Sequence, residues 1–351
     1  MNSRKINADK EMMYEPKLEH IDVEITKRCN LACIHCSARS NTKGMELSLN
    51  KVKAVLDSAR SLGLKEIGFT GGEPLMHRAK MVALLKYCKE SLKVKIHVHT
   101  NGTLLETKDA AILADLVDEM TIPILGSKPQ THDHITSVKG SLKGAEKALR
   151  TLLDQSANVK VFLVPLKPNF REIPSIVIKV HKMGCHRFRV LSLSPTGRSR
   201  NDFASLSLDF DEVEWLTKQL LKAQAELGVS IDAGFCTRQD FPQLGSLEGH
   251  QPCLAAENRV HIDAFGGVFP CTAASGIQQF SAGNLRKCKY DLPSIWKFSP
   301  MLQFLRYFHS NPPNQCRTCQ AYKQCMGGCR VMMQYKHGDM TATKSGCRFP
   351  E

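Results

Sequence analysis

Three cysteines stand close together near the amino-terminal end of the chain: Cys29, Cys33 and Cys36, in a C-x3-C-x2-C spacing. Thiolates are soft ligands that suit iron–sulfur clusters and zinc. Three thiolates on one loop can hold three irons of a [4Fe–4S] cube and leave the fourth iron without a protein ligand. Such an open position is what a catalytic metal site requires. The spacing alone leaves two alternatives open: a zinc knuckle completed by a distant His or Cys, or three unrelated buried cysteines.

A second set of cysteines lies in the C-terminal third of the chain, with Gly266 between its first two members. It comprises Cys253, Cys271, Cys316, Cys319, Cys325, Cys329 and Cys347. The chain has 14 cysteines in all, and its first twenty residues lack the apolar run of a secretory signal. We therefore expect a cytoplasmic protein whose thiols bind metal, rather than a disulfide scaffold. A zinc ribbon would explain one or two of the pairs but not the whole set.

Length and composition exclude several classes of protein. The 351 residues allow two or three domains, or one large α/β domain with a smaller module. No stretch approaches the roughly 18 apolar residues that cross a bilayer, so no membrane association is expected. The net charge of +14 suits acidic partners such as an acidic peptide, an anionic cofactor or nucleic acid. A solvated basic surface explains it equally well, and since no compact block of Lys and Arg is present, nucleic acid is not an expected partner.

The cysteines need a scaffold, and the sequence between Ile21 and Leu193 predicts one. Six apolar, β-rich runs are expected to be strands: Asp22–Thr26, Glu66–Thr70, Val94–Thr100, Glu119–Ile124, Val159–Pro165 and Arg187–Ser192. Amphipathic helical patterns alternate with them: Ser48–Leu62, Arg78–Ser91, Lys108–Leu116, Leu142–Asp154 and Ile173–Met183. This alternation predicts βαβ units and a parallel sheet. The fold class is therefore α/β, a partial (β/α)6 TIM-like barrel with its chemistry at the C-terminal ends of the strands.

The character of the sequence changes after Gly228. One more helix is predicted at Phe210–Leu227, and beyond it Cys, Gly and Pro become dense while the apolar periodicity fades. We expect an N-terminal extension at 1–20, a core barrel at 21–230 and a Cys-rich, loop-rich iron–sulfur domain at 231–351. That last region looks too poor in apolar pattern for a large core of its own, and small domains of this kind commonly need metal cross-links.

The first cysteine set resembles the signature of the radical SAM superfamily, C-x3-C-x-Φ-C. His35 stands at the position Φ, which is usually aromatic. The resemblance implies that Cys29, Cys33 and Cys36 ligate a [4Fe–4S] cluster whose open iron binds S-adenosylmethionine (SAM). It also implies reductive cleavage of SAM to a 5′-deoxyadenosyl radical, which abstracts hydrogen from a substrate C–H bond. The protein would supply orientation and protection for this chemistry.

Residues that follow other predicted strands strengthen the resemblance. Gly71-Gly72-Glu73 resembles the family's GGE segment, which binds the amino group of SAM; alone, a tight turn with an exposed Glu would explain it. Thr100-Asn101-Gly102 resembles the family's turn after the third strand, so Asn101 is expected near the cofactor. Ser192 and Arg198 lie at the exit of the sixth predicted strand, where a polar or basic side chain often reaches the ribose or carboxylate of SAM.

The second cysteine set resembles the SPASM extension of radical SAM enzymes: C-x9–15-G-x4-C, a gap, C-x2-C-x5-C-x3-C, a gap, and C. The resemblance implies two auxiliary [4Fe–4S] clusters. Cluster I would be ligated by Cys253, Cys271 and Cys329, and cluster II by Cys316, Cys319, Cys325 and Cys347. Two complete cubes need one more ligand, for which Cys236 is the preferred residue and Cys288 the second choice. Alternatively, cluster I keeps an open iron for a substrate thiolate, or Cys236 donates a hydrogen atom to a substrate radical.

The resemblance also narrows the substrate. SPASM enzymes mostly modify ribosomal peptides or proteins by cross-linking, epimerisation or oxidation, which is our main expectation. The alternatives are a small molecule (sugar epimerisation or dehydrogenation, or tailoring of a tetrapyrrole or redox cofactor) and a non-catalytic iron–sulfur electron carrier. Thr272 stands where sulfatase-maturing relatives have an aspartate base, which disfavours that reaction. Expected partners are a low-potential electron donor such as flavodoxin or ferredoxin and, because the N-terminal extension is short, a separate leader-binding protein.

The histidines are expected to have structural roles. His97 and His99 alternate along the third predicted strand and so face the same side of the sheet, as packing or polar lining residues. His132 and His134 follow the fourth predicted strand and are expected on an exposed loop.

Overall fold

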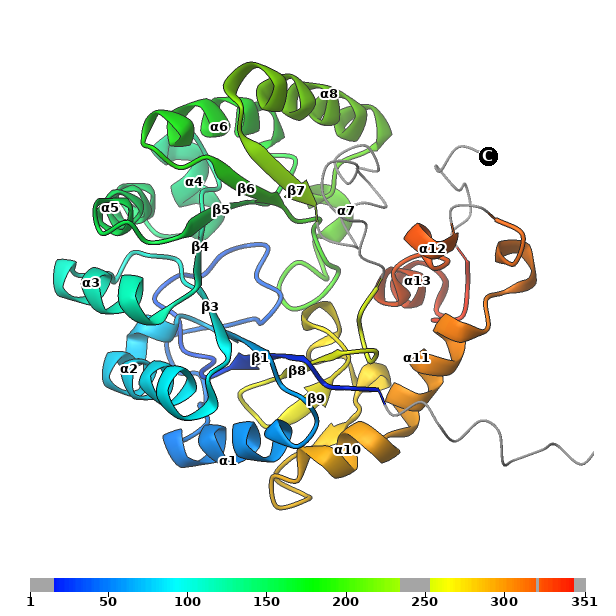
Figure 1. Ribbon diagram of the computed structural model, residues 1–351. Coiled ribbons are helices and arrows are strands. Elements are labelled where there is room, and N and C mark those ends of the chain that lie inside the picture. Colours follow the sequence, from blue (N-terminus) through cyan, green and yellow to red (C-terminus); the bar gives the residue numbers. More distant parts are fainter. Residues whose placement is uncertain (1–15, 234–252, 320–321, 344–351) are drawn as a thin grey trace, which may run out of the picture.

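The computed structural model describes residues 16–233, 253–319 and 322–343 (Figure 1). Its centre is a ten-stranded sheet in the order β10-β9-β8-β1-β2-β3-β4-β5-β6-β7. Neighbouring strands from β8 through β7 in this order pair in parallel, whereas β9 pairs antiparallel with both β8 and β10. The strands are β1 His20–Glu24, β2 Glu66–Thr70, β3 Lys95–His99, β4 Glu119–Pro123, β5 Val159–Leu163, β6 Arg187–Val190, β7 Ser230–Ala233, β8 Arg259–Ile262, β9 Gly267–Phe269 and β10 Gly283–Asn284.

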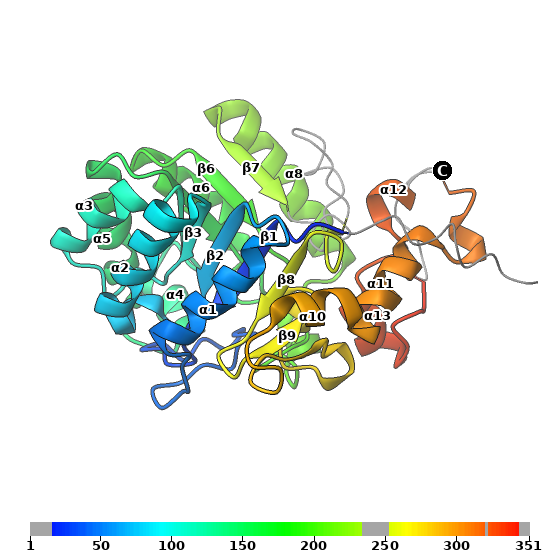
Figure 2. The ribbon, with the colours of Figure 1, turned by 60° about the horizontal axis from the view of Figure 1, so that its bottom comes forward.

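Helices surround the outer side of this sheet, which curves into an open barrel (Figure 1). Those that follow β1 to β6 are α1 Leu49–Arg60, α2 Arg78–Lys86, α3 Thr107–Leu116, α4 Pro129–Thr136, α5 Ser141–Asp154, α6 Ile173–Lys182, α7 Phe203–Leu206 and α8 Phe210–Leu227. The C-terminal region adds α10 Leu292–Phe298, α11 Pro300–Ser310, α12 Tyr322–Cys325 and α13 Arg330–His337. Figure 2 shows these last helices gathered on one side of the barrel, beyond β8 and β9.

The predicted partial barrel is confirmed, and two further strands extend it. All six predicted strands are present as β1 to β6, with β2 at the predicted bounds Glu66–Thr70. Every predicted helix is also present, although the one predicted at Arg78–Ser91 changes after Lys86 into a π-helical turn over Tyr87–Leu92. The parallel strands β7 and β8 continue the arc at its two ends, where the sequence pattern had predicted none.

Local sequence explains where the longest helix begins and ends. The Asp209 side chain accepts a hydrogen bond from the Glu212 amide at 3.1 Å, and the Glu212 side chain accepts one from the Asp209 amide at 2.9 Å. This reciprocal capping box starts α8. The helix ends at Gly228, whose φ of +63° is a left-handed conformation that glycine adopts without steric cost.

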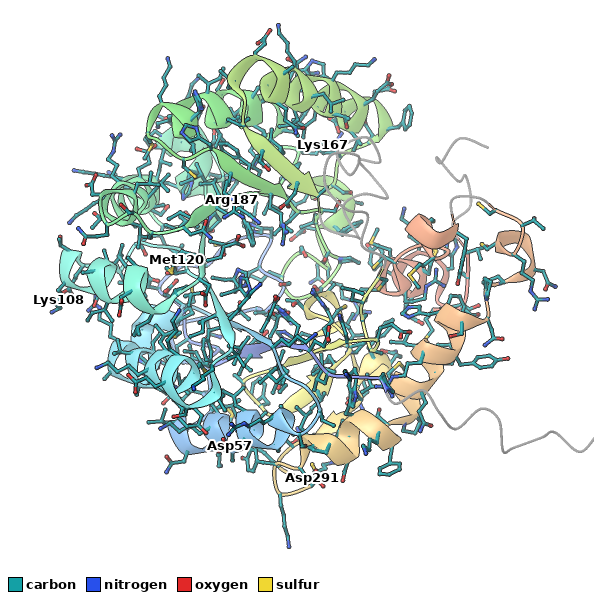
Figure 3. All side chains as sticks on the ribbon, in the orientation of Figure 1. Asp57, Lys108, Met120, Lys167, Arg187 and Asp291 are labelled. Carbon is teal, nitrogen blue, oxygen red and sulfur yellow. The ribbon has the colours of Figure 1, made fainter. Side chains whose placement is uncertain are left out.

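The two faces of the sheet differ in character. Apolar side chains such as Ile21, Val23, Ile67 and Phe69 are almost completely buried, and they join one core with the surrounding helices. The alternate residues face the inside of the barrel and are mostly polar, as expected from the two-residue period of a strand. The barrel thus keeps its hydrophobic core between sheet and helices and presents charged side chains on its inner face (Figure 3).

The C-terminal region shares the core of the barrel. Strand β8 pairs with β1 in the register His20↔Arg259 to Val23↔Ile262, and Trp296, Leu302 and Leu305 belong to the same apolar core as the barrel helices. The Trp296 indole also donates a hydrogen bond to the Pro16 carbonyl at 2.6 Å. Strands on both sides of residue 230 therefore belong to one sheet, and the apolar residues beyond it pack mainly against the barrel.

The loop predicted around His132 is a helix, α4, which the sequence analysis missed. His132 is buried, with 2% of its surface exposed, and its Nδ1 accepts a hydrogen bond from the Leu125 amide at 3.1 Å. The expectation of an exposed loop is therefore wrong for His132, whereas His134 is exposed. The reason is tertiary: Ile135, one turn along, packs in a small apolar cluster with Leu125.

Among the described residues, no helix combines the length and the apolar character that a membrane span requires.

Candidate iron–sulfur and cofactor site

The first cysteine loop leaves the C-terminal end of β1 and is held by backbone hydrogen bonds. The Cys29 amide donates to the Asn41 carbonyl at 2.9 Å. The Ala32 and Ile34 amides donate to the carbonyls of Thr136 and Ile135 in α4, at 3.0 and 2.9 Å. These bonds fix the positions of the residues between the cysteines before any metal binds.

The three thiols of this loop fit a cluster with soft ligands. Cys29 Sγ accepts hydrogen bonds from the Leu31 amide at 3.4 Å and from the Asn101 side chain at 3.8 Å, as a thiolate ligand would. Burial, with a contribution from the Cys36 thiolate, raises the pKa of Cys29 to about 11 and that of Cys33 to about 12, so Cys36 lies within electrostatic reach of both other sulfurs. Within the described residues, no three His, Cys, Asp or Glu side chains form a group suited to a single metal ion. The fit to a multi-iron cluster therefore rests on this donor set.

The two glycines after β2 pack against the cysteine loop itself. A Cβ atom on Gly71 would lie 2.4 Å from the Thr26 carbonyl oxygen, and one on Gly72 would lie 2.0 Å from the Arg28 carbonyl oxygen. Hydrogen bonds hold the two backbones together here: the Gly72 amide donates to the Thr26 carbonyl and the Glu73 amide to the Arg28 carbonyl, each at 2.7 Å. These glycines are needed because two backbones meet here, a reason that the sequence analysis did not anticipate.

Glu73 is completely buried, so the alternative of an exposed turn residue is wrong. Its carboxylate accepts three hydrogen bonds, from the Leu75 amide at 2.9 Å, the Thr100 hydroxyl at 2.6 Å and the Asn101 amide at 2.7 Å. Burial raises the pKa of Glu73, and these three donors oppose that rise. The side chain thus joins the turns that follow β2 and β3. A contact between this segment and the SAM amino group stays a prediction.

Asn101 joins the turn after β3 to the cysteine loop. Its side-chain Nδ2 donates to Asn30 Oδ1 at 3.0 Å as well as to Cys29 Sγ, and its side-chain Oδ1 accepts a hydrogen bond from the Thr103 backbone amide. Asn30 in turn donates to the Thr103 hydroxyl at 2.7 Å. The structure therefore brings Asn101 to the first cysteine, where the sequence analysis expects the cofactor.

The segment after β6 also reaches the cysteine loop. Arg198 Nε donates to the Cys33 carbonyl at 2.8 Å, Arg198 Nη1 donates to the Ser40 carbonyl at 2.7 Å, and the Arg198 amide donates to the Cys36 carbonyl at 3.0 Å. Arg198 therefore positions this loop, whatever further contact it makes with SAM. Ser192 is half-buried, two residues beyond the end of β6.

His35 is half-buried within the loop, and its Nδ1 atom is buried without a hydrogen-bond partner. Burial lowers its pKa to about 4, and the nearby charge of Arg198 acts in the same direction. The imidazole is therefore neutral at pH 7 and can donate or accept one hydrogen bond toward a ligand.

Six of the seven cysteines of the second set lie in the described residues. Burial, together with the thiolates of Cys329 and Cys253, raises the pKa of Cys271 to about 12, so these three sulfurs lie within electrostatic reach of one another although their segments are far apart in sequence. Cys271 and Cys329 also pack in one apolar cluster with Phe269 and Phe280. This grouping agrees with the ligand set expected for cluster I.

The other cysteines are distributed differently. Cys236 and Cys347 lie outside the described residues, so the eighth-ligand hypothesis and the last member of cluster II stay predictions. Cys88 and Cys185 are buried in the main core, as expected for packing thiols. The Cys288 thiol donates to carbonyls of its own turn, including that of Asp291 at 3.5 Å.

A buried polar link that no motif predicted joins β1 to the C-terminal region. Glu24, 2% exposed, pairs with Lys27 at 2.6 Å and with His261 of β8 at 3.2 Å, and the Ser275 hydroxyl lies 3.5 Å away. Although burial raises the pKa of the Glu24 carboxyl, His261 and Lys27 lower it to about 2. The link connects the segment before Cys29 with the segment after Cys271. Only the buried position of Glu24 at the end of a strand could have indicated it.

The inner face of the barrel carries paired charges. Asp232 of β7 pairs with Arg189 of β6 and, at 3.2 Å, with Lys160 of β5, and Lys160 also pairs with Glu119 at 3.2 Å. His99 Nδ1 lies 2.5 Å from the Thr121 hydroxyl, and burial lowers the pKa of His99 to about 4. The charge of Asp22 on β1 acts on both His97 and His99, which confirms that the two histidines share the inner face.

Two family models match the chain. Residues 23–180 match the model described as the radical SAM superfamily, and residues 253–320 match SPASM, an iron–sulfur cluster-binding domain. The first match spans the cysteine loop and the turns after β2 and β3, and the second begins at Cys253.

Three curated relatives are similar over most of the chain. An AdoMet-dependent heme synthase from Nitratidesulfovibrio vulgaris is 27% identical over 95% of this chain and 93% of its own length. The PqqA peptide cyclase of Gluconobacter oxydans is 26% identical over 92% of this chain and 88% of its own length. The mycofactocin maturase MftC of Mycobacterium tuberculosis is 29% identical over 87% of this chain and 76% of its own length.

Solved structures share the fold. SuiB from Streptococcus suis, bound to S-adenosylmethionine, superposes with a TM-score of 0.74 at 19% identity, covering 95% of this chain and 77% of that one. The structure of anSMEcpe with bound AdoMet gives a TM-score of 0.71 at 17% identity, covering 92% of this chain and 93% of that one.

Proposed function

Because this chain belongs to the radical SAM superfamily and contains a SPASM domain, we propose that it modifies a ribosomally made peptide or protein by abstracting hydrogen from a C–H bond. The enzyme uses a [4Fe–4S] cluster and SAM. We assign Cys29, Cys33 and Cys36 as the ligands of this cluster. When bound and reduced, it supplies the electron that cleaves SAM.

One observation above all supports this assignment: the segments that follow β2 and β6, and the C-terminal end of α4, are hydrogen-bonded to the cysteine loop at the C-terminal end of the barrel. In this arrangement, Asn101 orients the Cys29 sulfur and Arg198 holds the loop carbonyls. Glu73 keeps the turns after β2 and β3 together. The chain thereby fixes the site before the cofactor arrives, which is the condition for oriented radical chemistry. We propose Gly71, Gly72, Ser192 and His35 as further contacts of SAM.

We further propose two auxiliary [4Fe–4S] clusters within residues 231–351, with residues 21–230 as the catalytic core. Cys253, Cys271 and Cys329 would ligate cluster I, and Cys316, Cys319, Cys325 and Cys347 cluster II, with Cys236 as the eighth ligand. The proximity of the first three sulfurs supports this division. Cysteine thiols stay reduced, and so available as cluster ligands, in a reducing compartment. We therefore place the enzyme in the cytoplasm. We also propose a low-potential electron donor such as flavodoxin or ferredoxin.

The peptide substrate is supported by relatives named for peptide cyclisation and maturation. A second candidate is a tetrapyrrole, because the relative that matches over 95% of this chain is named a heme synthase. The excess of positive charge in the chain suits the carboxylates of either an acidic peptide or a tetrapyrrole. A separate leader-binding protein would assist the first kind of substrate only.

The two substrates can be separated by deuterium transfer. The anaerobically reconstituted enzyme is given SAM, a reductant and either an acidic peptide encoded beside its gene or a porphyrin carboxylate, each deuterated at its C–H positions. We expect deuterium in 5′-deoxyadenosine from the peptide, and none from a Cys36→Ala variant. A matched Cys88→Ala variant, which changes a core thiol, keeps the transfer.

Transfer from the porphyrin alone would replace the peptide proposal with the tetrapyrrole one. A protein that binds iron but produces no 5′-deoxyadenosine with any substrate would contradict the catalytic function.

A further inference from the structure

Arg330, the residue directly after Cys329, places a guanidinium group inside the C-terminal region. Only 7% of its surface is exposed. It donates hydrogen bonds to the Gly328 carbonyl at 2.9 Å and to the Met340 and Ala342 carbonyls at 2.8 Å each, and also to the Gly327 carbonyl. Its charged carbon lies 4.5 Å from the centre of the Phe308 ring.

Among the described residues, every hydrogen-bond acceptor of this guanidinium is a neutral carbonyl. No carboxylate among the described residues lies within ion-pair distance of it, although Asp339, which is exposed, feels its charge. A buried cation without an anionic partner costs several kcal/mol, so native proteins normally place an opposite charge beside it. The described residues supply no such charge for Arg330, and an anionic cluster bound nearby would supply it.

Thiols and the Tyr322 phenol are the ionisable groups that act most strongly on the charge of Arg330. Burial lowers its pKa, and ionised sulfur on Cys329, Cys253 and Cys325 opposes that shift, so all three lie within its electrostatic reach. A Cβ atom on Gly327 would lie 3.4 Å from Arg330 Nη2 and 3.9 Å from Cys316 Sγ, so a fourth thiol and the guanidinium approach the same glycine.

These four thiols come from both auxiliary sets. Cys253 and Cys329 belong to the set assigned to cluster I, and Cys316 and Cys325 to the set assigned to cluster II. Arg330 thus lies within reach of sulfurs from both sets, which become negative together when clusters form. A single positive charge in a site of low polarity can act on both.

We propose that Arg330 is the shared counter-charge of the two auxiliary clusters and raises both of their reduction potentials. The inference rests on the auxiliary clusters of the proposed function. An electron added to a thiolate-ligated cluster increases its negative charge, and a nearby buried cation stabilises that reduced form. The guanidinium also donates hydrogen bonds to the carbonyls of Gly327 and Gly328. This turn lies between Cys325, assigned to cluster II, and Cys329, assigned to cluster I, so the same side chain positions a ligand of each cluster.

The test compares Arg330→Met and Arg330→Lys in the full-length enzyme, reconstituted without oxygen. Iron is counted first, and the cluster potentials are then measured by redox titration followed by electron paramagnetic resonance. In Arg330→Met, both auxiliary potentials should shift to more negative values while that of the SAM-binding cluster stays unchanged. Arg330→Lys keeps the charge and should stay close to the parent enzyme. Unchanged potentials in a fully loaded Arg330→Met enzyme, or equal shifts in the two variants, would overturn the proposal.

Arg306 is the matched control. It also donates to carbonyls, of Ala256 at 2.8 Å and Trp296 at 2.9 Å, and it stacks on the Trp296 ring at 4.2 Å. These two carbonyls belong to the segment before β8 and to α10, whereas Arg330 donates to carbonyls of the turn between Cys325 and Cys329. Arg306→Met should therefore leave the auxiliary potentials unchanged, and a shift equal to that of Arg330→Met would contradict a specific role for Arg330.

The iron count separates this proposal from the proposed function. If the parent enzyme holds about four irons instead of about twelve, the auxiliary clusters themselves are absent and both proposals fail. If Arg330→Met loses the auxiliary irons that the parent enzyme holds, the iron content of Arg330→Lys distinguishes a role of the charge from a role in holding the turn. Retained irons in Arg330→Lys support the counter-charge, whereas their loss shows that Arg330 only ties the turn.

Discussion

The two cysteine regions of this molecule are built in opposite ways. The first three cysteines share one loop, and that loop is hydrogen-bonded to segments that follow three other elements of the barrel. Cys253, Cys271 and Cys329 come from distant segments, and the guanidinium of Arg330, next to Cys329, donates to neutral carbonyls within the described residues. The first site is thus shaped by hydrogen bonds of the protein, whereas we propose that the second depends on the charge of its clusters. The predictions below test this difference.

The largest effect is expected at the first site. Cys33→Ala removes one of three proposed ligands, and production of 5′-deoxyadenosine should fall to background because no other described side chain can replace the thiolate. The auxiliary clusters should still assemble, giving about eight irons per chain. Measured turnover in this variant, or loss of all iron, would contradict the independence of the two regions.

A substitution in the second cysteine region should leave SAM cleavage at the first site intact. In Cys271→Ala, we expect the loss of up to about four irons per chain, while SAM is still cleaved without productive substrate modification. Iron analysis and chromatography of 5′-deoxyadenosine measure the two effects. An enzyme that loses SAM cleavage in parallel with its auxiliary iron would show that the regions are coupled, with the Glu24–His261 link as the first connection to examine.

Gly72→Ala tests the packing that shapes the first site. Its added Cβ would lie 2.0 Å from the Arg28 carbonyl oxygen, so the turn after β2 must move away from the cysteine loop. Such overpacking typically costs about 1–3 kcal/mol, visible in chemical denaturation, and SAM affinity should fall with it.

Gly140→Ala is the comparison for this variant. Gly140 has a φ of +84° but nothing within 4 Å of an added Cβ atom, so its substitution carries backbone strain alone. Equal losses of SAM affinity in the two variants would argue against a specific role for the contact at Gly72.

The smallest effect concerns pH. Burial lowers the pKa of His132 to about 4 from an ordinary 6.5, so between these values the unfolded chain binds a proton that the folded chain does not. Stability therefore falls as the pH drops from 6.5 to 4, by up to about 1.4 kcal/mol per pH unit from this residue. His132→Asn should flatten the dependence in denaturation curves at pH 7 and pH 5, because the asparagine does not titrate. An unchanged slope would mean that other groups dominate the acid response.

Sequence periodicity predicted the barrel but missed the strands that complete it. β1 to β6 lie where β-rich runs alternate with amphipathic helices, whereas β7 and β8 lie beyond Gly228, where Cys, Gly and Pro are dense and the apolar periodicity fades. The motif residues were found because the spacing of cysteines is a local property. Arg330, Glu24 and His261 were not, because their roles arise from contacts between segments more than two hundred residues apart or from the burial of one side chain.

The pairing of β8 with β1 makes the order of chain synthesis important. Until residues 259–262 have left the ribosome, the strand that leads into the first cysteine loop has a neighbour on one side only. An exposed edge of this kind invites pairing with other chains. A fragment that ends before β8 would therefore be prone to self-association even though it includes every cysteine of the first loop, and its light-scattering behaviour in comparison with the full chain would reveal the contribution of β8.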